Sequence, residues 1–347
     1  MKKNWIRLTL ALLLTAFFLF LAFRKVEWSS ALRSMTRVNV GLFIIVILLM
    51  PLHFVTRGFR WRYLLIHEKK DVRFSNLFAG NVVGFMVTFI FPGRIGEIIK
   101  PLWVARKENV RPGFVIGTVV VERIFDIFTM CFLLGIFLLA EPLYSSFFHV
   151  RAEAYAKLTT WGIAGVVFAT VLLGLSLTFY FFKEKALGVA GFFLKPVPEK
   201  LRVKILALLH EFIDGLKFFH SLGNVLIYIG LSIVVWLGIT FFYWVFFLSY
   251  GVHLTYFLLI PYIFLTGVGA SIPTPGMAGG FHAFSILGLT LLYPEVFSAS
   301  DTSLAAGLTI VVHAIQLVMT CLMGYAILSK EGLSVFQLKK LGETIEP

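Results

Sequence analysis

The chain has 347 residues, of which 59% are hydrophobic and 14% are charged, and its mean hydropathy is +0.90. A soluble domain is nearer half apolar and a quarter charged, so this composition excludes an ordinary soluble enzyme and indicates a polytopic helical membrane protein. The formal net charge of +13 comes mostly from Lys and Arg residues that flank apolar segments, where they orient the protein and contact anionic lipid, so we expect no nucleic-acid partner.

Nine apolar segments follow one another along the chain, and three of them are too short to cross a membrane. A spanning helix needs roughly 20 residues, with about 17 as a practical minimum. The first segment does not resemble a cleaved signal peptide, because it lacks a clear small-residue cleavage site and another span follows directly. The three short segments all border Pro/Gly breaks. The nine segments lie at residues 6–23, 41–56, 77–91, 112–140, 159–182, 224–250, 256–271, 281–293 and 303–328.

The distribution of basic residues decides between two topologies. If all nine segments crossed from a cytoplasmic N-terminus, the loop 183–222, with seven Lys and Arg residues, would lie outside, against the positive-inside rule. If 77–105 and 256–293 are instead re-entrant hairpins entering from opposite sides, 22 Lys and Arg residues face the cytoplasm and six face outside. The sequence therefore predicts one all-α domain over 1–347, with about six full spans, two oppositely oriented hairpins and both termini in the cytoplasm of a prokaryotic cell.

Paired interrupted segments of opposite orientation are typical of inverted-repeat transporters, in which the substrate site lies between them. This symmetry is a hypothesis from hydropathy, since no clear sequence repeat is visible. The segment 183–222 reads either as one or two amphipathic helices on the cytoplasmic surface or as a packed linker. The stretch "RGFRWRY", at 57–63, is most simply an interfacial anchor of basic and aromatic residues.

The first hairpin is interrupted by "FPGRIGEIIKP", at 91–101, where three charged residues recur every third position. On a helix this spacing places them on one broad side, and the free N–H groups at the start of a half-helix favour an anion. Ionisable groups at membrane depth are costly unless paired, so we interpret them as substrate-binding. An Arg94–Glu97 pair that only pins the hairpin is the alternative. The charged residues are Arg94, Glu97 and Lys100, and the break is formed by Pro92, Gly93 and Gly96.

A second charged group, "VERIFDIF", lies inside the long apolar segment 112–140. Glu122 and Asp126 share a helix face, and Arg123 can pair with Asp126 three residues on. The two acids and one base leave one excess negative charge, which Lys100 or Arg94 could balance if the hairpin packs against this helix. The sequence thus predicts a mixed-charge buried site suited to a zwitterionic or phosphate-bearing headgroup, with a purely structural ion-pair network as the alternative.

The second hairpin is broken by "IPTPGMAGGFH". His282 follows the break and is a candidate substrate-binding residue, although a lone membrane histidine is more often a hydrogen-bonded packing residue. His313 and Gln316, three residues apart, are read in the same way. The residues that form the break are Pro273, Pro275, Gly276, Gly279 and Gly280.

Several signatures of catalysis are missing from the sequence. It has no phosphate-binding G-x-x-x-x-G-K-[ST] loop, no H-E-x-x-H, no C-x-x-C and no G-x-S-x-G. Cys131 and Cys321 lie in apolar runs and have no disulfide or metal-ligand spacing. We therefore expect no catalytic residue, cofactor or metal. An intramembrane transferase with Glu97 or Asp126 as general base, or a scaffold for another enzyme, remain alternatives.

The three broken or charged elements, taken in order, resemble the lysylphosphatidylglycerol synthase transmembrane-region family, also called the flippase-like domain family. The resemblance covers nearly the whole chain. Its "P-x-PGG-x-G" break has Met277 here where a second glycine is usual, and His282 stands roughly where a glutamate often sits. The matching residues are Gly93, Arg94, Gly96, Glu97 and Lys100, then Glu122, Arg123 and Asp126, and finally Pro273, Pro275, Gly276 and Gly279.

The resemblance implies a membrane domain that moves lipids between the leaflets of a cytoplasmic membrane. In two-part members a cytoplasmic aminoacyl-transferase domain makes lysyl-phosphatidylglycerol, and the membrane domain flips it. The chain reaches Pro347 without such a domain, so we expect a stand-alone translocator. The expected partners are membrane lipids, namely an anionic or aminoacylated phospholipid, a glycolipid or a hopanoid-type cargo, and a lipid-biosynthetic enzyme.

Overall fold

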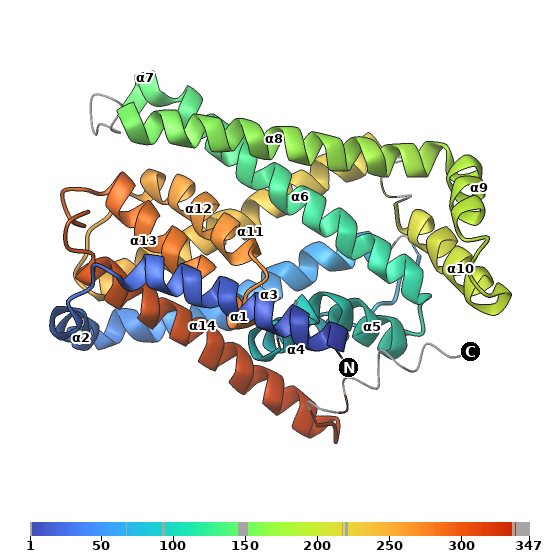
Figure 1. Ribbon diagram of the computed structural model, residues 1–347, viewed down its shortest axis with the longest axis horizontal. Helices are drawn as coiled ribbons and strands as arrows, with labels where there is room; N and C mark the ends of the chain where they lie inside the picture. Colours follow the sequence, from blue (N-terminus) through green and yellow to red (C-terminus); the bar gives the residue numbers. More distant parts are fainter. Residues whose placement is uncertain are drawn as a thin grey trace.

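The computed structural model describes residues 2–66, 68–91, 94–144, 152–216, 218, 221–334 and 337, and this part of the chain is built of α-helices joined by turns and short 3-10 segments (Figure 1). The predicted all-α membrane architecture is confirmed. Helices suit this setting because they satisfy every backbone polar group internally. The helices are α1 (Lys2–Phe23), α2 (Trp28–Thr36), α3 (Val40–Leu65), α4 (Phe74–Ile90), α5 (Gly96–Glu108), α6 (Pro112–Leu139), α7 (Glu141–Tyr144), α8 (Ala152–Phe181), α9 (Lys183–Phe193), α10 (Glu199–Gly215), α11 (Leu222–Ser249), α12 (Leu259–Ser271), α13 (Gly280–Leu292) and α14 (Ser303–Lys330).

Five stretches within the described residues are long and apolar enough to cross a membrane. Four belong to α3, α8, α11 and α14, which are among the six predicted spans. The fifth, Pro275–Leu292, lies in the predicted second hairpin and joins a 3-10 turn to α13, which alone has only 13 residues and rises about 20 Å. The other two predicted spans are α1 and α6; α6 is 28 residues long but carries three charged residues in its middle.

The connections between helices gather at two opposite ends of the molecule. At one end Asn39 N donates to Ser249 O at 2.6 Å and Lys25 Nζ donates to Ala299 O at 2.9 Å, so the loops after α1, α11 and α13 meet there. The other end holds the loops after α3, α5 and α8 together with α10. Its contacts include Lys69 Nζ to Glu108 Oε2 at 3.0 Å, Lys183 Nζ to Asp214 Oδ1 at 2.9 Å, and Arg111 Nη1 to Asp214 Oδ2 at 3.1 Å.

This grouping of the loops matches the two sides of the predicted six-span topology. The segments assigned to the cytoplasm are 57–73, 105–112 and 183–222, and the loops that the structure forms within them share one end. The contacts of segments 24–39 and 294–302, assigned to the outside, lie at the other end. Figure 1 shows the short helices α9 and α10 at one end of the long axis and α2 at the opposite end. Which end faces the cytoplasm, and whether the hairpins are re-entrant in a bilayer, stay predictions.

Two helical hairpins, α4–α5 and α12–α13, are each closed by a pair of glycines. A Cβ on Gly96 would lie 1.9 Å from the carbonyl oxygen of Gly84, so α4 and α5 touch backbone to backbone at this point. In the second hairpin a Cβ on Gly269 would lie 2.5 Å from the carbonyl oxygen of Gly280, and the reverse distance is also 2.5 Å. Small residues allow this close approach of helices in a membrane.

The same order of elements occurs twice, in opposite directions. A long helix, a two-helix hairpin and a second long helix form α3 to α6, and they recur as α11 to α14. The helices α3 and α11 pack antiparallel, because Tyr63 near the end of α3 donates to Asn224 near the start of α11 at 3.0 Å, while Asn39 and Ser249 meet at their other ends. The inverted-repeat hypothesis therefore has a structural counterpart in this order of elements.

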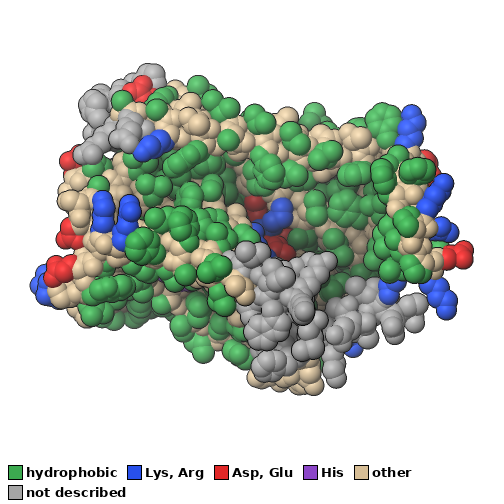
Figure 2. Space-filling model, viewed as in Figure 1, with side chains coloured by type: hydrophobic (Ala, Val, Ile, Leu, Met, Phe, Trp, Pro, Cys, Tyr) green, Lys and Arg blue, Asp and Glu red, His purple; other side chains and the backbone are tan. Residues whose placement is uncertain are grey.

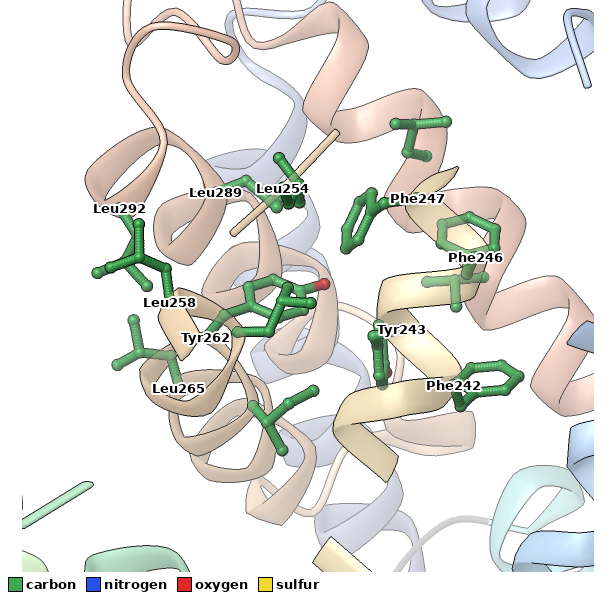
Figure 3. Packing of buried hydrophobic residues seen from close by; sticks show 14 of the residues in the cluster. Phe242, Tyr243, Phe246, Phe247, Leu254, Leu258, Tyr262, Leu265, Leu289 and Leu292 are labelled. Carbon is green, nitrogen blue, oxygen red and sulfur yellow. The ribbon is translucent and has the colours of Figure 1, made fainter. Parts of the chain in front are cut away.

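An aromatic core holds the second hairpin against α11. Figure 3 shows Tyr243, Phe246 and Phe247 on one side of this core and Leu258 and Tyr262 on the other. The ring centroids of Tyr262 lie 5.5 Å from Tyr243 and 5.8 Å from Phe247. The hydroxyl of Tyr262 also hydrogen-bonds to Ser285 at 2.9 Å, so its polar end is satisfied within the bundle. The hairpin is thereby fixed in position beside the charged residues described next.

Candidate functional site: a buried ion-pair network between the first hairpin and three long helices

The middle of α6 supplies the two acids at the centre of the site. Glu122 is fully buried and Asp126 is 5% exposed, and both project from one face of the helix as their spacing predicts. Arg123 Nη1 lies 3.3 Å from Asp126 Oδ2, which is the i, i+3 pair expected from the sequence. Charges at this depth need partners, and the remaining partners come from other helices.

Two arginines of α3 are the principal partners of these acids. Arg60 is fully buried, and its guanidinium donates to Asp126 at 2.7 Å and to Glu122 at 2.9 Å. Arg57 is 5% exposed and lies 3.6 Å from Glu122 and 3.7 Å from Asp126. A single fork-shaped guanidinium that bridges two carboxylates is the geometry for which arginine is suited.

The interpretation of "RGFRWRY" as an interfacial anchor is therefore wrong for Arg57 and Arg60. The predicted segment ended at residue 56, whereas α3 continues to Leu65 and carries this stretch into the bundle. Arg57, Arg60, Trp61 and Leu64 are all buried, and they recur at the three- and four-residue spacing of one helix face. That spacing was the available signal, but the density of basic residues concealed it.

The first hairpin contributes Lys100 to the network. Lys100 is 2% exposed, and its Nζ lies 2.5 Å from Glu122 Oε2 and 4.4 Å from the ring centroid of Trp61. The expected contact between the hairpin and the α6 charges is thus present. Gly84 makes room for it, since a Cβ there would lie 2.7 Å from Cβ of Lys100.

Aromatic and hydroxyl side chains of α11 complete the inner side of the network. Trp236 Nε1 donates to Asp126 Oδ1 at 3.2 Å, and Arg60 donates to Ser232 Oγ at 3.3 Å. The Arg60 guanidinium also lies 5.7 Å from the ring centroid of Tyr228. These α11 residues were not expected, because nothing in an apolar helix distinguishes a tryptophan that binds a carboxylate from one that packs in the core.

Glu97 and Arg123 form the accessible side of the network. Their side chains are 30% and 33% exposed, and Arg123 Nε lies 3.8 Å from Glu97 Oε2. Arg123 therefore bridges Glu97 of the hairpin to Asp126 of α6, and the two charged motifs belong to one site. Figure 2 shows acidic and basic side chains gathered in a hollow on a face that is otherwise mostly hydrophobic.

Arg94 occupies the tip of the first hairpin in a left-handed backbone conformation, with φ of 56°. Its Nη2 donates to the carbonyl oxygen of Ala270 at 3.2 Å, so it ties the first hairpin to the second rather than only to Glu97. It still interacts electrostatically with Glu97 and Arg123. The break residues Pro92 and Gly93 lie outside the described residues.

The break of the second hairpin also meets its neighbours closely. Gly276 has φ of 61°, and its carbonyl oxygen is 2.9 Å from His313 Nε2. Gly279 has φ of 84° and lies against the backbone of Thr15 in α1, where a Cβ would be 2.9 Å from the carbonyl oxygen. The glycines are needed here because L side chains disfavour these conformations. Pro275 begins the 3-10 turn between α12 and α13, and Pro273 lies two residues before it.

His282 lies at the start of α13, where it caps its own helix. The backbone N of Gly279 points to His282 Nδ1 at 3.4 Å, and the ring centroids of His282 and His313 lie 4.8 Å apart. His313 and Gln316 instead line a cavity of about 180 Å³, together with Arg57 and Tyr243. Gln316 donates to the hydroxyl of Tyr243 at 3.1 Å. A role of His282 in substrate binding stays a prediction.

The site carries more positive charge than the six predicted charged residues, which are three bases and three acids and would be neutral together. Five cationic side chains, from Arg57, Arg60, Arg94, Lys100 and Arg123, meet three carboxylates, from Glu97, Glu122 and Asp126. The formal surplus is two positive charges. It comes from the two α3 arginines, which the sequence interpretation had placed outside the site. Among the described residues no group of three His, Cys, Asp or Glu side chains is arranged to hold a metal ion.

Comparison with known proteins places these features in a family context. The family model described as "Lysylphosphatidylglycerol synthase TM region" matches residues 6–324. The chain is also similar to the UPF0104 membrane protein MJ1595 of Methanocaldococcus jannaschii, with 21% identity over 336 residues that cover 94% of this chain and 95% of that protein. No solved structure matches the chain.

Proposed function

Because the chain belongs to the lysylphosphatidylglycerol synthase TM region family, we propose that it moves a phospholipid or lipid-linked headgroup between the leaflets of a prokaryotic cytoplasmic membrane. The family name already points to a lipid-related role in a membrane. The finer proposal, translocation through an intramembrane charged site, is supported by the geometry of that site.

The observation that carries the proposal is a surplus of buried arginine donors beside an accessible pair. Among the described residues, Arg57 Nη1, Arg94 Nε and Arg123 Nε are buried nitrogens without a hydrogen-bond partner within the chain. Buried polar groups are usually paired, and guanidinium groups are the preferred donors to phosphate. An anionic phosphate would supply acceptors for donors of this kind, and the single charge of a phosphodiester would offset one of the two surplus positive charges.

The remaining carboxylate extends the range of headgroups. Glu97 is the most exposed acid of the network, and its contact with Arg123, at 3.8 Å, is the longest in the network. An amine or hydroxyl on the cargo would find an acceptor there while its phosphate meets Arg123 or Arg94. A zwitterionic or aminoacylated headgroup therefore suits the site as well as a simple anionic one.

The transferase alternative depends on a free general base, and the network limits the choice of residue. Asp126 accepts from Arg60 and Trp236 and lies within 4 Å of Arg57 and Arg123, so it is a poor proton acceptor. Glu97 is the better placed of the two bases suggested by the sequence. Translocation needs no such base, and we therefore prefer it.

The test is lipid exchange by the purified protein in liposomes. Wild type should accelerate movement of fluorescent lipid between leaflets, and Glu97→Gln and Arg94→Ala should each slow it by about tenfold or more, equivalent to roughly 1.4 kcal/mol of lost stabilisation. Arg106→Ala, at an exposed position of α5, is the matched control and should retain wild-type exchange.

The same preparation distinguishes the alternatives. If wild type moves no lipid, even with a pH gradient across the liposomes, the translocation proposal fails. Lipid acceptors should then be offered, and a covalent product would support the transferase. If all variants move lipid at the wild-type rate, the charged site is not the path.

A further inference from the structure

A groove of about 430 Å³ lies between α6, α8, α12 and α13, beside the charged network. Its walls are almost entirely hydrocarbon and aromatic. Phe168, Phe264 and Phe284 contribute rings from three different helices, and Ser271 supplies the one hydroxyl among its described lining residues. A surface of this kind offers a polar ligand almost no hydrogen-bond partner, so an apolar occupant is indicated.

One end of the groove borders the charged network at two independent points. Ile127, which lines the groove, directly follows Asp126 on α6. Ser271, which also lines it, directly follows Ala270, whose carbonyl oxygen accepts the hydrogen bond from Arg94. The groove and the charged network are therefore neighbours along both α6 and α12, and a molecule with its polar head on Arg94 and Arg123 would have its apolar tail on the side of the groove.

Two glycines shape the walls of the groove. A Cβ on Gly165 of α8 would lie 2.7 Å from Sγ of Cys131, and a Cβ on Gly267 of α12 would lie 2.3 Å from Cε of Met130. Both walls are therefore bare backbone at these positions, where a larger side chain would collide with α6. Gly267 also lines the inner cavity next to Arg57, so α12 is a thin partition between the groove and the interior.

The outer lip of the groove faces the region that lipid occupies. Only 17% of the apolar window of α8 is buried within the protein, and Ala164 and Phe168 on its lip are exposed. The lining of α8 runs from Trp161 to Phe168, which is about 10 Å along the helix axis at 1.5 Å per residue. A spanning partner helix of about 30 Å would need a longer surface, whereas part of one hydrocarbon chain fits.

We propose that this groove binds one hydrocarbon chain of the lipid whose headgroup occupies the charged network. The inference rests on the proposed function for the identity of the headgroup site. It adds that the lipid enters sideways between α8 and α12, with its chain held along α6 while its headgroup meets Arg123 and Glu97.

The test is photolabelling with a phosphatidylglycerol analogue that carries a diazirine in one acyl chain, followed by mass-spectrometric mapping of the labelled peptides. Wild type should be labelled within 127–131 or 264–271. Ala164→Trp places an indole in the groove and should lower this labelling at least fivefold. Ile163→Trp is the matched control, since Ile163 is also exposed, at the preceding position of α8, but does not line the groove. Val268→Trp, on the opposite lip, repeats the test from α12.

Labelling and lipid exchange together separate this inference from the proposed function. Groove labelling that is blocked by both groove tryptophans supports the chain site even if wild type transports nothing. Labelling spread evenly over the helix surfaces, or unchanged in Ala164→Trp and Val268→Trp, overturns it. Equal labelling in Arg123→Ala and wild type also overturns it, since the chain would then bind independently of the headgroup. If Ala164→Trp exchanges lipid at the wild-type rate, the groove is not on the path, although translocation itself would stand.

Discussion

Arg60 is the residue on which the buried network most depends. It contacts both Glu122 and Asp126. Lys100, by contrast, contacts Glu122. The side chain of Arg123 is one-third exposed. The sequence indicated that Glu122, Arg123 and Asp126 needed partners from another element, and Lys100 was correctly among the candidates. Arg60 was not recognised, because an arginine among other basic residues near the predicted end of a span is ordinarily interfacial, and this concealed its helical spacing with Trp61 and Leu64. Only the packing of α3 against α6 and α11 distinguishes it.

Replacing Arg60 with alanine should strongly destabilise the protein. Two carboxylates would lose a buried donor, and removal of one partner from a buried ion pair costs about 3–5 kcal/mol. We expect the free energy of unfolding in mild detergent to fall by about 3 kcal/mol. Arg60→Lys should recover part of this loss, since an ammonium group keeps the positive charge but cannot bridge the two carboxylates as a guanidinium does.

The control for Arg60 is Arg106→Ala, which removes an exposed arginine and should change stability by less than about 0.5 kcal/mol. Equal stability of Arg60→Ala and Arg106→Ala would contradict a structural role for the Arg60 contacts. If Arg60→Lys is no more stable than Arg60→Ala, the shape of the guanidinium group rather than its charge matters most.

At the scale of elements, the two hairpins α4–α5 and α12–α13 distinguish this fold from a bundle of long helices alone. Both were predicted from short apolar segments beside Pro/Gly breaks, and both occur as pairs of packed helices. The glycine pairs Gly84–Gly96 and Gly269–Gly280 that close them were only partly foreseeable. Gly96 and Gly280 stood in the quoted motifs, but which glycine of the facing helix opposes each one depends on the register of packing.

Gly96→Ala should open the first hairpin. The added Cβ would lie 1.9 Å from the carbonyl oxygen of Gly84 and 2.3 Å from Oγ1 of Thr88, so the helices must separate. Overpacking of this kind costs about 1–3 kcal/mol, and here it would also draw Lys100 away from Glu122. We expect a lower melting temperature and a lower yield of monodisperse protein on size-exclusion chromatography.

Gly174→Ala provides the matched comparison for Gly96→Ala. Gly174 is also helical, but a Cβ there meets nothing within 4 Å. This substitution should leave the melting temperature unchanged or raise it slightly, since alanine favours a helix by about 0.5–1 kcal/mol over glycine. If the two alanine variants melt at the same temperature, the close approach of α4 and α5 does not contribute to stability.

At the scale of the whole molecule, the inverted order of α3–α6 and α11–α14 brings the charged network and the second hairpin together. The first hairpin carries Lys100 and Glu97 into the bundle from one end, and the second reaches Arg94 through Ala270 from the other. Counting Lys and Arg residues predicted which loops share a side, because these residues are enriched in the loops on one side of a membrane. It could not predict that the hairpin tips touch, since no sequence signal links Arg94 to a backbone carbonyl 176 residues away.

The orientation of the molecule in the membrane can be tested with two single cysteines in a variant that lacks Cys131 and Cys321. Lys200 on α10 and Ser300 before α14 are both exposed, and they lie at opposite ends of the molecule. A membrane-impermeant maleimide added to intact cells should label Ser300→Cys. It should label Lys200→Cys only after the membrane is permeabilised, because the end rich in Lys and Arg is expected in the cytoplasm.

This pair of positions separates the six-span topology from a nine-span one. If all nine apolar segments crossed from a cytoplasmic N-terminus, position 200 would be outside and position 300 inside, so the labelling pattern would reverse. Such a chain would also place 24–39 and 183–222 on the same side, whereas Lys25 and Lys183 belong to opposite ends of this structure. Labelling of Lys200→Cys in sealed cells would therefore contradict the positive-inside assignment. Labelling of Ser300→Cys alone would place the open ends of α4–α5 and α12–α13 on opposite sides of the bilayer, as alternating access of the charged site to the two leaflets requires.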